Sequence, residues 1–329
     1  MGVTCTPHDA LVRAIFGQAH YAAEELRSVL SPEILAELRL GTLAPIDASF
    51  IDEGLRESSA DLLFSVTLRR GGNGMVYVLF EHQSTPDPLM PWRLLQYQAR
   101  IWARHLADHP EEATVPPIEP LLLHHGPRPW PFPQRFAGML ALEEHARTSF
   151  GGRLLDFEFV LDDLATQTDA QILGRAMDAV ARLTLVALRS SRSQPRLFEH
   201  VAKVMQALES ELRGPAVVPA LARLARYVLE VGDSPPEVIR SAFAAALSHE
   251  IRSSVMSTAD MLRAEGRLEG RLEGRLEARC QSLLEQLEVK FGPVDRAIRV
   301  RVEHATLEQL ITWLRRVVVV SSLEEVFAG

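Results

Sequence analysis

Residues 75–84 read MVYVLFEHQS, and this stretch decides how the rest of the chain is interpreted. Its first six residues are apolar and rich in β-branched and aromatic side chains, which is typical of a buried β-strand. The last four are polar: a carboxylate, an imidazole, an amide and a hydroxyl. A strand that serves packing alone does not need such an end. The stretch therefore predicts a central strand that carries function at its carboxyl end.

A second strand-like stretch, ADLLFSVTLRR at residues 60–70, comes shortly before it. The residues between the two, RRGGNG, are a dense turn signal, so the pair is predicted to form an antiparallel hairpin. A three-residue loop at residues 71–73 gives the following register, to within a residue or two: Asp61 opposite Gln83, and Leu63 opposite Glu81.

The segments around the hairpin complete an α/β pattern. Apolar residues at helical spacing predict a helix over residues 7–30, a short helix over residues 31–40 and a helix over residues 94–106. Residues 48–55 are compatible with a short strand, and residues 118–126, IEPLLLHHG, with a buried one. The order helix, three strands, helix, strand predicts an α/β core with a mixed sheet.

The chain is predicted to fall into four parts. They are a core over residues 1–164, a helical bundle over residues 165–255, a repeat helix over residues 256–280 and a small helical domain over residues 281–329. The last part is expected to be a helical hairpin, because a Gly-Pro pair ends one helix and a threonine N-cap starts another.

The repeat helix contains GRLEGRLEGRLEARC, which starts at Gly266 and repeats every four residues. On an α-helix each repeat shifts by about 40°, so glycine, arginine, leucine and glutamate each form a stripe. Like charges four residues apart and repeated glycines weaken an isolated helix. Two interpretations stay open: a spacer helix, or a coiled coil through which residues 260–280 join copies of the chain into a homo-oligomer.

Composition restricts the class of protein. The 329 residues carry a formal net charge of −8, which argues against a protein that coats duplex DNA, although not against an enzyme with a local basic patch. No apolar run is long enough to span a bilayer, and no secretory signal precedes the first helix. The two cysteines, Cys5 and Cys280, can form neither a disulfide framework nor a zinc site alone. We expect a cytoplasmic protein without a membrane partner.

Oxygen-bearing groups at the end of the hairpin predict a metal site. Glu81 and Gln83 alternate onto one face of their strand, with the main-chain carbonyl of His82 between them, and Asp61 interrupts the apolar strand opposite. Two carboxylates and a carbonyl are hard ligands of the kind that Mg²⁺ prefers. Such a metal can neutralise charge on a phosphodiester and lower the pKa of a bound water, which Gln83 can orient.

Four motifs in this order resemble those of the recombination-promoting nuclease family, also known as the YhgA-like transposase family. The resemblance covers about residues 7–250, and the repeat and the tail resemble C-terminal segments that often follow this family. It implies a PD-(D/E)XK nuclease core, that is, a DNA endonuclease that uses Mg²⁺ or another divalent cation, with a link to recombination or mobile elements. The motifs are HDALVRAIF (8–16), ADLLFSV (60–66), YVLFEHQSTPDPLMPWRLLQYQARIW (77–102) and LLLHHGPRPW (121–130).

The resemblance also implies roles for single residues. Asp61 matches the metal-binding aspartate of the superfamily, and Glu81 matches its second carboxylate. Gln83 stands where the superfamily usually has lysine, a form that we associate with this family and not with loss of activity. The positive charge of that lysine is then left to Arg93 on the following helix or to a second metal ion.

Other residues near these motifs have a structural and a functional interpretation. Asp9 is expected to stabilise the start of the first helix and is a secondary candidate for reaching the metal. Tyr97, one turn after Arg93, is expected to give structural support, whereas Arg93 is equally suited to contact a phosphate. His124 and His125 should point to opposite faces of their strand as hydrogen-bonded structural residues.

Two functions from different classes remain. In the first, the protein is an endonuclease with Asp61, Glu81 and Gln83 at its catalytic site. In the second, a degenerate nuclease core serves as a scaffold in a non-catalytic protein that oligomerises through its C-terminal helices. The intact carboxylate pair favours the first, and the acidic net charge and the missing lysine favour the second. A transposase reaction is not supported, because no third carboxylate completes a strand-transfer site.

Overall fold

The computed structural model describes residues 6–47, 62–69, 75–191, 197–212, 216–232, 237–239, 241, 245, 255, 278–303, 305–320 and 322–327. The chain forms two compact units, one of Cys5–Asp260 and one of Met1–Thr4 together with Met261–Gly329. The predicted boundaries at residues 164 and 255 lie within the first unit, and the division into four domains stays a prediction. Of the predicted repeat helix, residues 256–277 lie outside the described residues.

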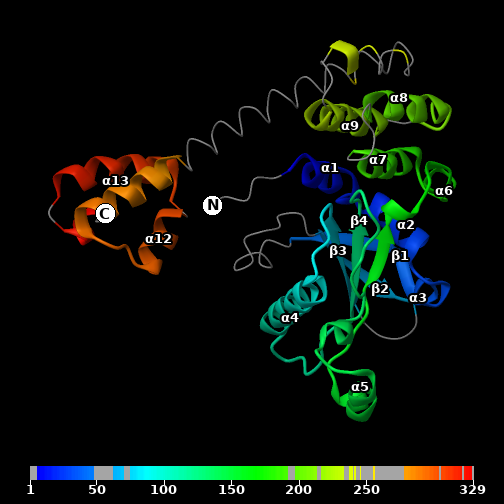
Figure 1. Cartoon of the computed structure of the whole chain (residues 1–329), viewed down its shortest axis with the longest axis horizontal. Coiled ribbons are helices and arrows are strands. Elements are labelled where there is room, and N and C mark those ends of the chain that lie inside the picture. The colour runs from blue at the N-terminus through cyan, green and yellow to red at the C-terminus, as the bar shows by residue number, and fades with distance from the viewer. Residues whose placement is uncertain are drawn as a thin grey trace. The chain divides into compact units, whose positions relative to one another are not determined.

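A mixed sheet forms the centre of the first unit (Figure 1). The second strand pairs antiparallel with both the first and the third. The fourth strand pairs parallel with both the third and the fifth. The mixed α/β sheet that the sequence predicts is therefore confirmed, with a fifth strand in addition. The strands lie in the order β1 (Leu38–Ile46), β2 (Leu62–Leu68), β3 (Met75–Gln83), β4 (Ile118–His124) and β5 (Val160–Asp163).

The hairpin of β2 and β3 is confirmed, but its register differs from the predicted one by two residues. Leu63 pairs with Leu79 and not with Glu81, and Thr67 pairs with Met75. Residues 70–74 lie outside the described residues, so the predicted three-residue loop stays a prediction. A shift by two residues leaves every position on its predicted face, because side chains alternate with a period of two along a strand.

Strand β1 was not predicted from the sequence. The short helix α3 (Pro32–Glu37) is followed at once by β1, where the sequence predicted helix through residue 40. Leu38 and Leu40 are buried while Arg39 between them is exposed, which is the two-residue repeat of a strand. The strand predicted at residues 48–55 lies outside the described residues.

Helices cover both faces of the sheet. On one face, α4 (Met90–Asp108) packs Leu94, Tyr97 and Ile101 into one core with Leu63 and Leu122 of the strands. On the other, α2 (Ala19–Val29) contacts β1 and β5. The single helix predicted over residues 7–30 is two helices, because α1 (Pro7–Phe16) ends at Gly17, where a Cβ would meet the backbone of the preceding turn at 2.3 Å.

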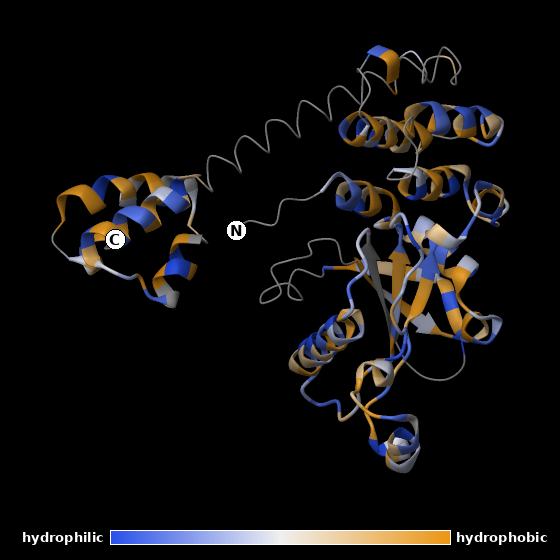
Figure 2. Ribbon diagram, viewed as in Figure 1, coloured by the Kyte–Doolittle hydropathy of each residue, from blue (hydrophilic) through white to orange (hydrophobic). Residues whose placement is uncertain are grey.

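A second helical layer lies on α1. Both α7 (Ala179–Ser190) and α9 (Val217–Val231) contact α1, and α8 (Leu197–Ala207) contacts α7, as Figure 1 shows above the sheet. Hydrophobic residues, orange in Figure 2, gather where these elements meet. The shorter helices of this unit are η2 (Phe136–Met139), α5 (Glu144–Phe150), η3 (Gly151–Arg153), η4 (Leu164–Thr166) and α6 (Asp169–Leu173).

The second unit is helical but is not the predicted two-helix hairpin. Residues 278–291 are helical, and α12 (Arg296–Glu303), α13 (Leu307–Val319) and α14 (Leu323–Val326) follow. The sequence did not predict α12, because RAIRVRVE alternates polar and β-branched residues and so lacks a helical period. In the described parts of both units, no helix has the length and apolarity needed to cross a membrane.

Since the second unit has its own core, a cavity there should destabilise that unit alone. Leu310 is fully buried in this core. We expect Leu310→Ala to lower the unfolding free energy of the second unit by about 2–5 kcal/mol. Calorimetry should show one transition moved to lower temperature and the other unchanged. Val318→Ala, at a side chain that is 69% exposed, should move neither. A joint shift of both transitions would contradict independent cores.

Candidate active site

The carboxyl end of β3 carries three of the residues that the sequence singles out. Glu81, His82 and Gln83 end the strand, and the structure describes their main chain. Because β3 and β4 are parallel, their carboxyl ends meet at the same edge of the sheet. In the ladder with β4 the three residues stand opposite Leu122, Leu123 and His124, respectively.

The ladder of β2 and β3 ends beside the predicted pair of carboxylates. Leu62 follows Asp61 directly in the sequence and pairs with Phe80, which precedes Glu81. Asp61 itself lies outside the described residues, so its place in a metal site stays a prediction. Within the ranges that the structure describes, histidine, cysteine, aspartate and glutamate side chains do not gather in threes as a metal site.

The register assigns residue positions 81 and 83 to one face of the sheet. Alternate positions of a strand share a face, and directly paired positions of neighbouring strands lie on the same side. Positions 81 and 83 therefore belong to the face of Leu122 and His124. This is the face that α4 covers, because Leu122 packs in the core formed with that helix. Position 82 belongs to the opposite face.

Two residues of α4, Arg93 and Tyr97, lie on the side of the sheet to which positions 81 and 83 belong. Tyr97 is fully buried in the core with Leu63 and Leu122, and its hydroxyl accepts a hydrogen bond of 3.0 Å from Nη2 of Arg93. Nη1 of Arg93 lies 3.3 Å from Oδ2 of Asp87. Tyr97 thus packs and supports as expected, and the Arg93 guanidinium is held between a buried hydroxyl and a carboxylate.

The turn after β4 packs tightly against the end of β3. Nε2 of His124 lies 2.9 Å from the carbonyl oxygen of Arg128, and its ring meets that of Trp130 edge-on at 5.3 Å between centroids. A Cβ on Gly126 would lie 2.5 Å from the His124 ring and 2.7 Å from the main-chain oxygen of Ser84. Gly126 is therefore required for this close approach, and His124 is a hydrogen-bonded structural residue.

The start of α1 is held by a capping box and by a contact to the helical layer. Oδ2 of Asp9 accepts from the Thr6 N–H at 2.8 Å, and Oγ1 of Thr6 accepts from the Asp9 N–H at 3.2 Å, which is the helix-terminal role expected of Asp9. Nδ1 of His8 lies 2.9 Å from the hydroxyl of Tyr227, and its ring is 5.1 Å from that of the fully buried His125. His8 thereby joins α1 to α9 and β4.

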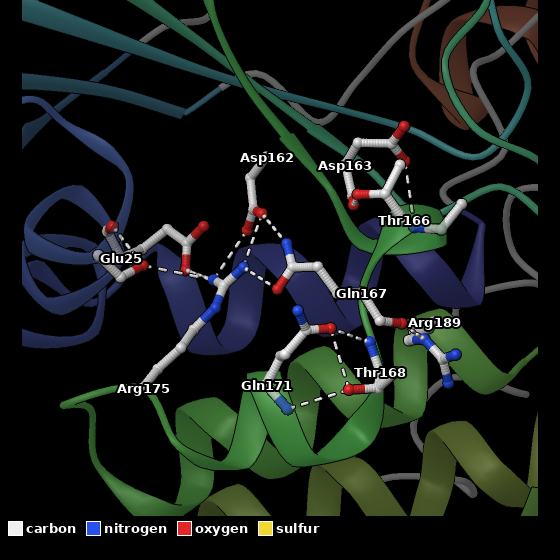
Figure 3. Close-up of polar contacts among 11 residues, drawn as sticks. Glu25, Asp162, Asp163, Thr166, Gln167, Thr168, Gln171, Arg175 and Arg189 are labelled. Carbon is white, nitrogen blue, oxygen red and sulfur yellow. Dashed lines mark hydrogen bonds and ion pairs between the residues drawn. The ribbon is translucent and has the colours of Figure 1, made fainter.

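Figure 3 shows a group of buried carboxylates that the sequence did not indicate. Arg175 donates to both carboxylate oxygens of Asp162, at 2.8 and 2.6 Å, and to Glu25 of α2 at 3.2 Å. Gln167 donates to Asp162 at 2.8 Å and accepts from Arg175 at 2.9 Å. Glu25 is 0% and Asp162 3% exposed, so both carboxylates are closed to solvent. Glu25 lies 150 residues from Arg175 in the chain, and only the fold brings the two together.

The two carboxyl groups of this cluster have opposite pKa shifts. Burial, together with the neighbouring charge of Asp162, holds the pKa of Glu25 well above its usual range. Burial acts against ionisation of Asp162 as well, but the hydrogen bonds from Arg175, Glu25 and Gln167 and the charge of Arg175 together lower the pKa of Asp162. Asp162 pairs with Leu123, so it lies on the face opposite to positions 81 and 83. The cluster therefore joins α2 to β5 and is separate from the candidate site.

Two isosteric variants should separate the two carboxyls. Glu25→Gln should be tolerated, because an amide resembles the protonated acid, whereas Asp162→Asn leaves Arg175 without its counter-charge and should cost about 3–5 kcal/mol. A raised folded pKa contributes stability below the unfolded pKa of about 4.3, and this contribution is lost as the pH rises. In urea unfolding between about pH 4 and pH 8, the free energy of unfolding of Glu25→Gln should rise relative to that of the wild type as the pH increases. Equal losses in both variants would contradict this assignment.

A methyl group at Gly126 should disturb the packing beside β3. Gly126→Ala forces either the His124 ring or the Ser84 main chain to move, and we expect a loss of about 1–3 kcal/mol in thermal unfolding. Gly41→Ala is the matched control, because a Cβ there meets nothing within 4 Å. Identical losses in the two variants would show that the close approach does not constrain the fold.

Comparison with known proteins gives a consistent set of relatives. A family model described as "Putative transposase, YhgA-like" matches residues 6–216. Recombination-promoting nuclease RpnD of Escherichia coli O157:H7 is 31% identical over 232 residues, which cover 70% of this chain and 84% of the relative. Recombination-promoting nuclease RpnA of Escherichia coli K12 is 30% identical over 265 residues, covering 79% and 85%. The inactive recombination-promoting nuclease-like protein RpnE of the same strain is 29% identical over 265 residues, covering 80% and 83%. No solved structure matches significantly.

Proposed function

Because the chain belongs to the YhgA-like family, whose relatives include recombination-promoting nucleases, we propose that it is a divalent-metal-dependent DNA endonuclease with a PD-(D/E)XK-like core. The observation that carries the proposal is the register of β2 and β3. The described part of their ladder includes Leu62 opposite Phe80, the sequence neighbours of Asp61 and Glu81. In the proposed site the ladder continues by one residue, which sets the two carboxylates opposite each other on the face covered by α4.

The proposed metal ligands are the carboxylates of Asp61 and Glu81 and the main-chain carbonyl of His82. All three are hard oxygen donors, which fits Mg²⁺ or another divalent cation. When bound, the metal would neutralise charge on the scissile phosphate and lower the pKa of a water. Gln83 follows Glu81 by two residues and so belongs to the same face of the strand. Its amide is proposed to orient the attacking water.

Arg93 is the proposed source of the positive charge that the superfamily usually takes from lysine. It belongs to the helix that covers the face of positions 81 and 83, and Tyr97 and Asp87 hold its guanidinium in place. A guanidinium stays charged at any working pH, although it cannot act as a base. Arg93→Gln should therefore slow cleavage more than it weakens DNA binding.

Cleavage of supercoiled plasmid by the full chain tests the site. With Mg²⁺ or Mn²⁺ we expect nicking that EDTA abolishes, and a loss of about 100-fold or more in Asp61→Asn and in Glu81→Gln. Glu119→Gln is the matched control. Glu119 lies on β4 of the same sheet, at a position that alternates onto the opposite face from Leu122. Burial raises the pKa of Glu119 to about 7, so a neutral amide suits its surroundings and cleavage should be unchanged.

Two outcomes would contradict the proposal at different levels. If Asp61→Asn and Glu81→Gln cut like the wild type, the protein is a nuclease with a different site. If the folded wild type cuts nothing with any divalent cation, it is not a nuclease under these conditions, and Gln83 is the first residue to examine. Circular dichroism of each variant separates lost chemistry from lost folding.

A second function is favoured by one observation. A relative that is 29% identical over 80% of this chain is named inactive, so the family includes a similar sequence named for the absence of the activity. In that case the core is a scaffold, and residues 260–280 join copies of the chain. Sedimentation of the full chain beside a variant that lacks these residues tests this second function. A wild type that is monomeric at all concentrations would exclude it.

A further inference from the structure

A basic hollow lies at the β1 edge of the sheet. It encloses about 740 Å³ and is formed where α2 and α3 meet the start of β1 and the end of β2. None of its lining residues is acidic, although the chain as a whole carries a net charge of −8. The lining consists of Arg27 from α2, Leu35 from α3, Arg39, Leu40 and Gly41 from β1, and Arg69 just after β2.

Main-chain carbonyl groups hold two of the three arginines. Nε of Arg69 donates to the carbonyl of Leu38 at 2.8 Å, and Nη2 of Arg39 donates to the carbonyl of Arg69 at 3.3 Å. A carbonyl orients a guanidinium without cancelling its charge, so both groups stay cationic and keep further N–H donors. In the part of the chain that the structure describes, no carboxylate forms an ion pair with Arg27, Arg39 or Arg69.

An irregularity in β1 shapes the wall of the hollow. Residues 40–43 stand opposite a single residue of β2, Val66, so the chain bulges out of the ladder. Oγ1 of Thr42 fills the gap by accepting a hydrogen bond of 3.0 Å from the Thr67 N–H. The bulge leaves Gly41 exposed, with no atom within 4 Å of the place where a Cβ would be. Such bulges redirect side chains at the edges of sheets.

We propose that this hollow binds the backbone phosphates of DNA. The guanidinium fork matches two phosphate oxygens at once, and three such groups from α2, β1 and the end of β2 converge on one concave surface. A local positive cluster of this kind lets a protein of negative net charge bind a polyanion at one place, although the rest of its surface does not attract the polyanion. The inference rests on the proposed function only for the identity of the polyanion.

The hollow and the proposed metal site lie at opposite ends of β2. From Leu62 to Leu68 the strand extends by about 20 Å, at roughly 3.3 Å per residue. A duplex advances about 3.4 Å per base pair, so about six base pairs cover that length. Measured along the strand alone, the arginines are therefore about half a helical turn of DNA away from the proposed metal site.

DNA binding without cleavage tests the hollow. The full chain is titrated into a fluorescein-labelled duplex in EDTA, and anisotropy is measured over a series of salt concentrations. Gly41→Glu is the sharpest variant, because it puts a carboxylate into the hollow without a clash and removes no arginine. We expect Gly41→Glu, Arg39→Gln and Arg69→Gln each to weaken binding about 5- to 20-fold and to reduce the salt slope by about 0.9 for each phosphate that is no longer bound. Arg223→Gln, at an exposed arginine of α9, should match the wild type.

The outcomes separate this inference from the proposed function. Wild-type affinity and salt slope in Gly41→Glu and Arg39→Gln, with unchanged thermal unfolding, would overturn the DNA contact. Competition by inorganic phosphate at the concentration of the DNA phosphates would also overturn it, by assigning the hollow to a small anion. Weakened binding in these variants supports the hollow even if the wild type cuts nothing, a result that would contradict only the nuclease.

Discussion

The parallel pairing of β3 with β4 is the constraint on which the rest of the first unit depends. β4 is an inner strand, and its residues from Leu121 to His124 are fully buried, so its neighbours on both sides must match its alternation. Leu122 and His124 set one face, and Leu123 sets the other. This alternation separates two groups of acids that a one-residue slip would exchange. Positions 81 and 83 of β3 belong to the face that α4 covers. Asp162 lies on the opposite face, where Arg175 donates hydrogen bonds to it.

The separation has an electrostatic consequence for the candidate site. A carboxylate raises the pKa of a carboxyl group that shares its site, as Asp162 does for Glu25 in the buried cluster. In that cluster an arginine supplies the compensating charge, and no solvent or ligand is needed. In the proposed site, the pair of carboxylates on the α4 face meets Arg93, which also contacts Asp87 and Tyr97. The proposed metal ion then supplies the remaining positive charge, whereas the Arg175 cluster contains its own cation.

Sequence patterns were sufficient where short-range order determined the outcome. Apolar periodicity predicted α4 and β4, and the polar end of β3 together with the motif order indicated the family. Long-range pairing was not predictable in the same way. The register of the hairpin differs by two residues from the predicted one, because the turn residues alone do not fix which positions of the two strands pair. Strand β1 follows α3 so directly that its first residues resemble the end of that helix. The Arg175 cluster joins residues more than a hundred positions apart, and nothing local marks Glu25 as buried.

The bulge in β1 also affects how the molecule behaves among its own copies. An edge strand presents unsatisfied N–H and C=O groups that can pair with a strand of another chain. In β1 the four displaced residues interrupt that edge, and Pro45 removes one donor near its end. The opposite edge, β5, has only four residues. Among the described residues, neither edge therefore offers a long straight template for sheet growth.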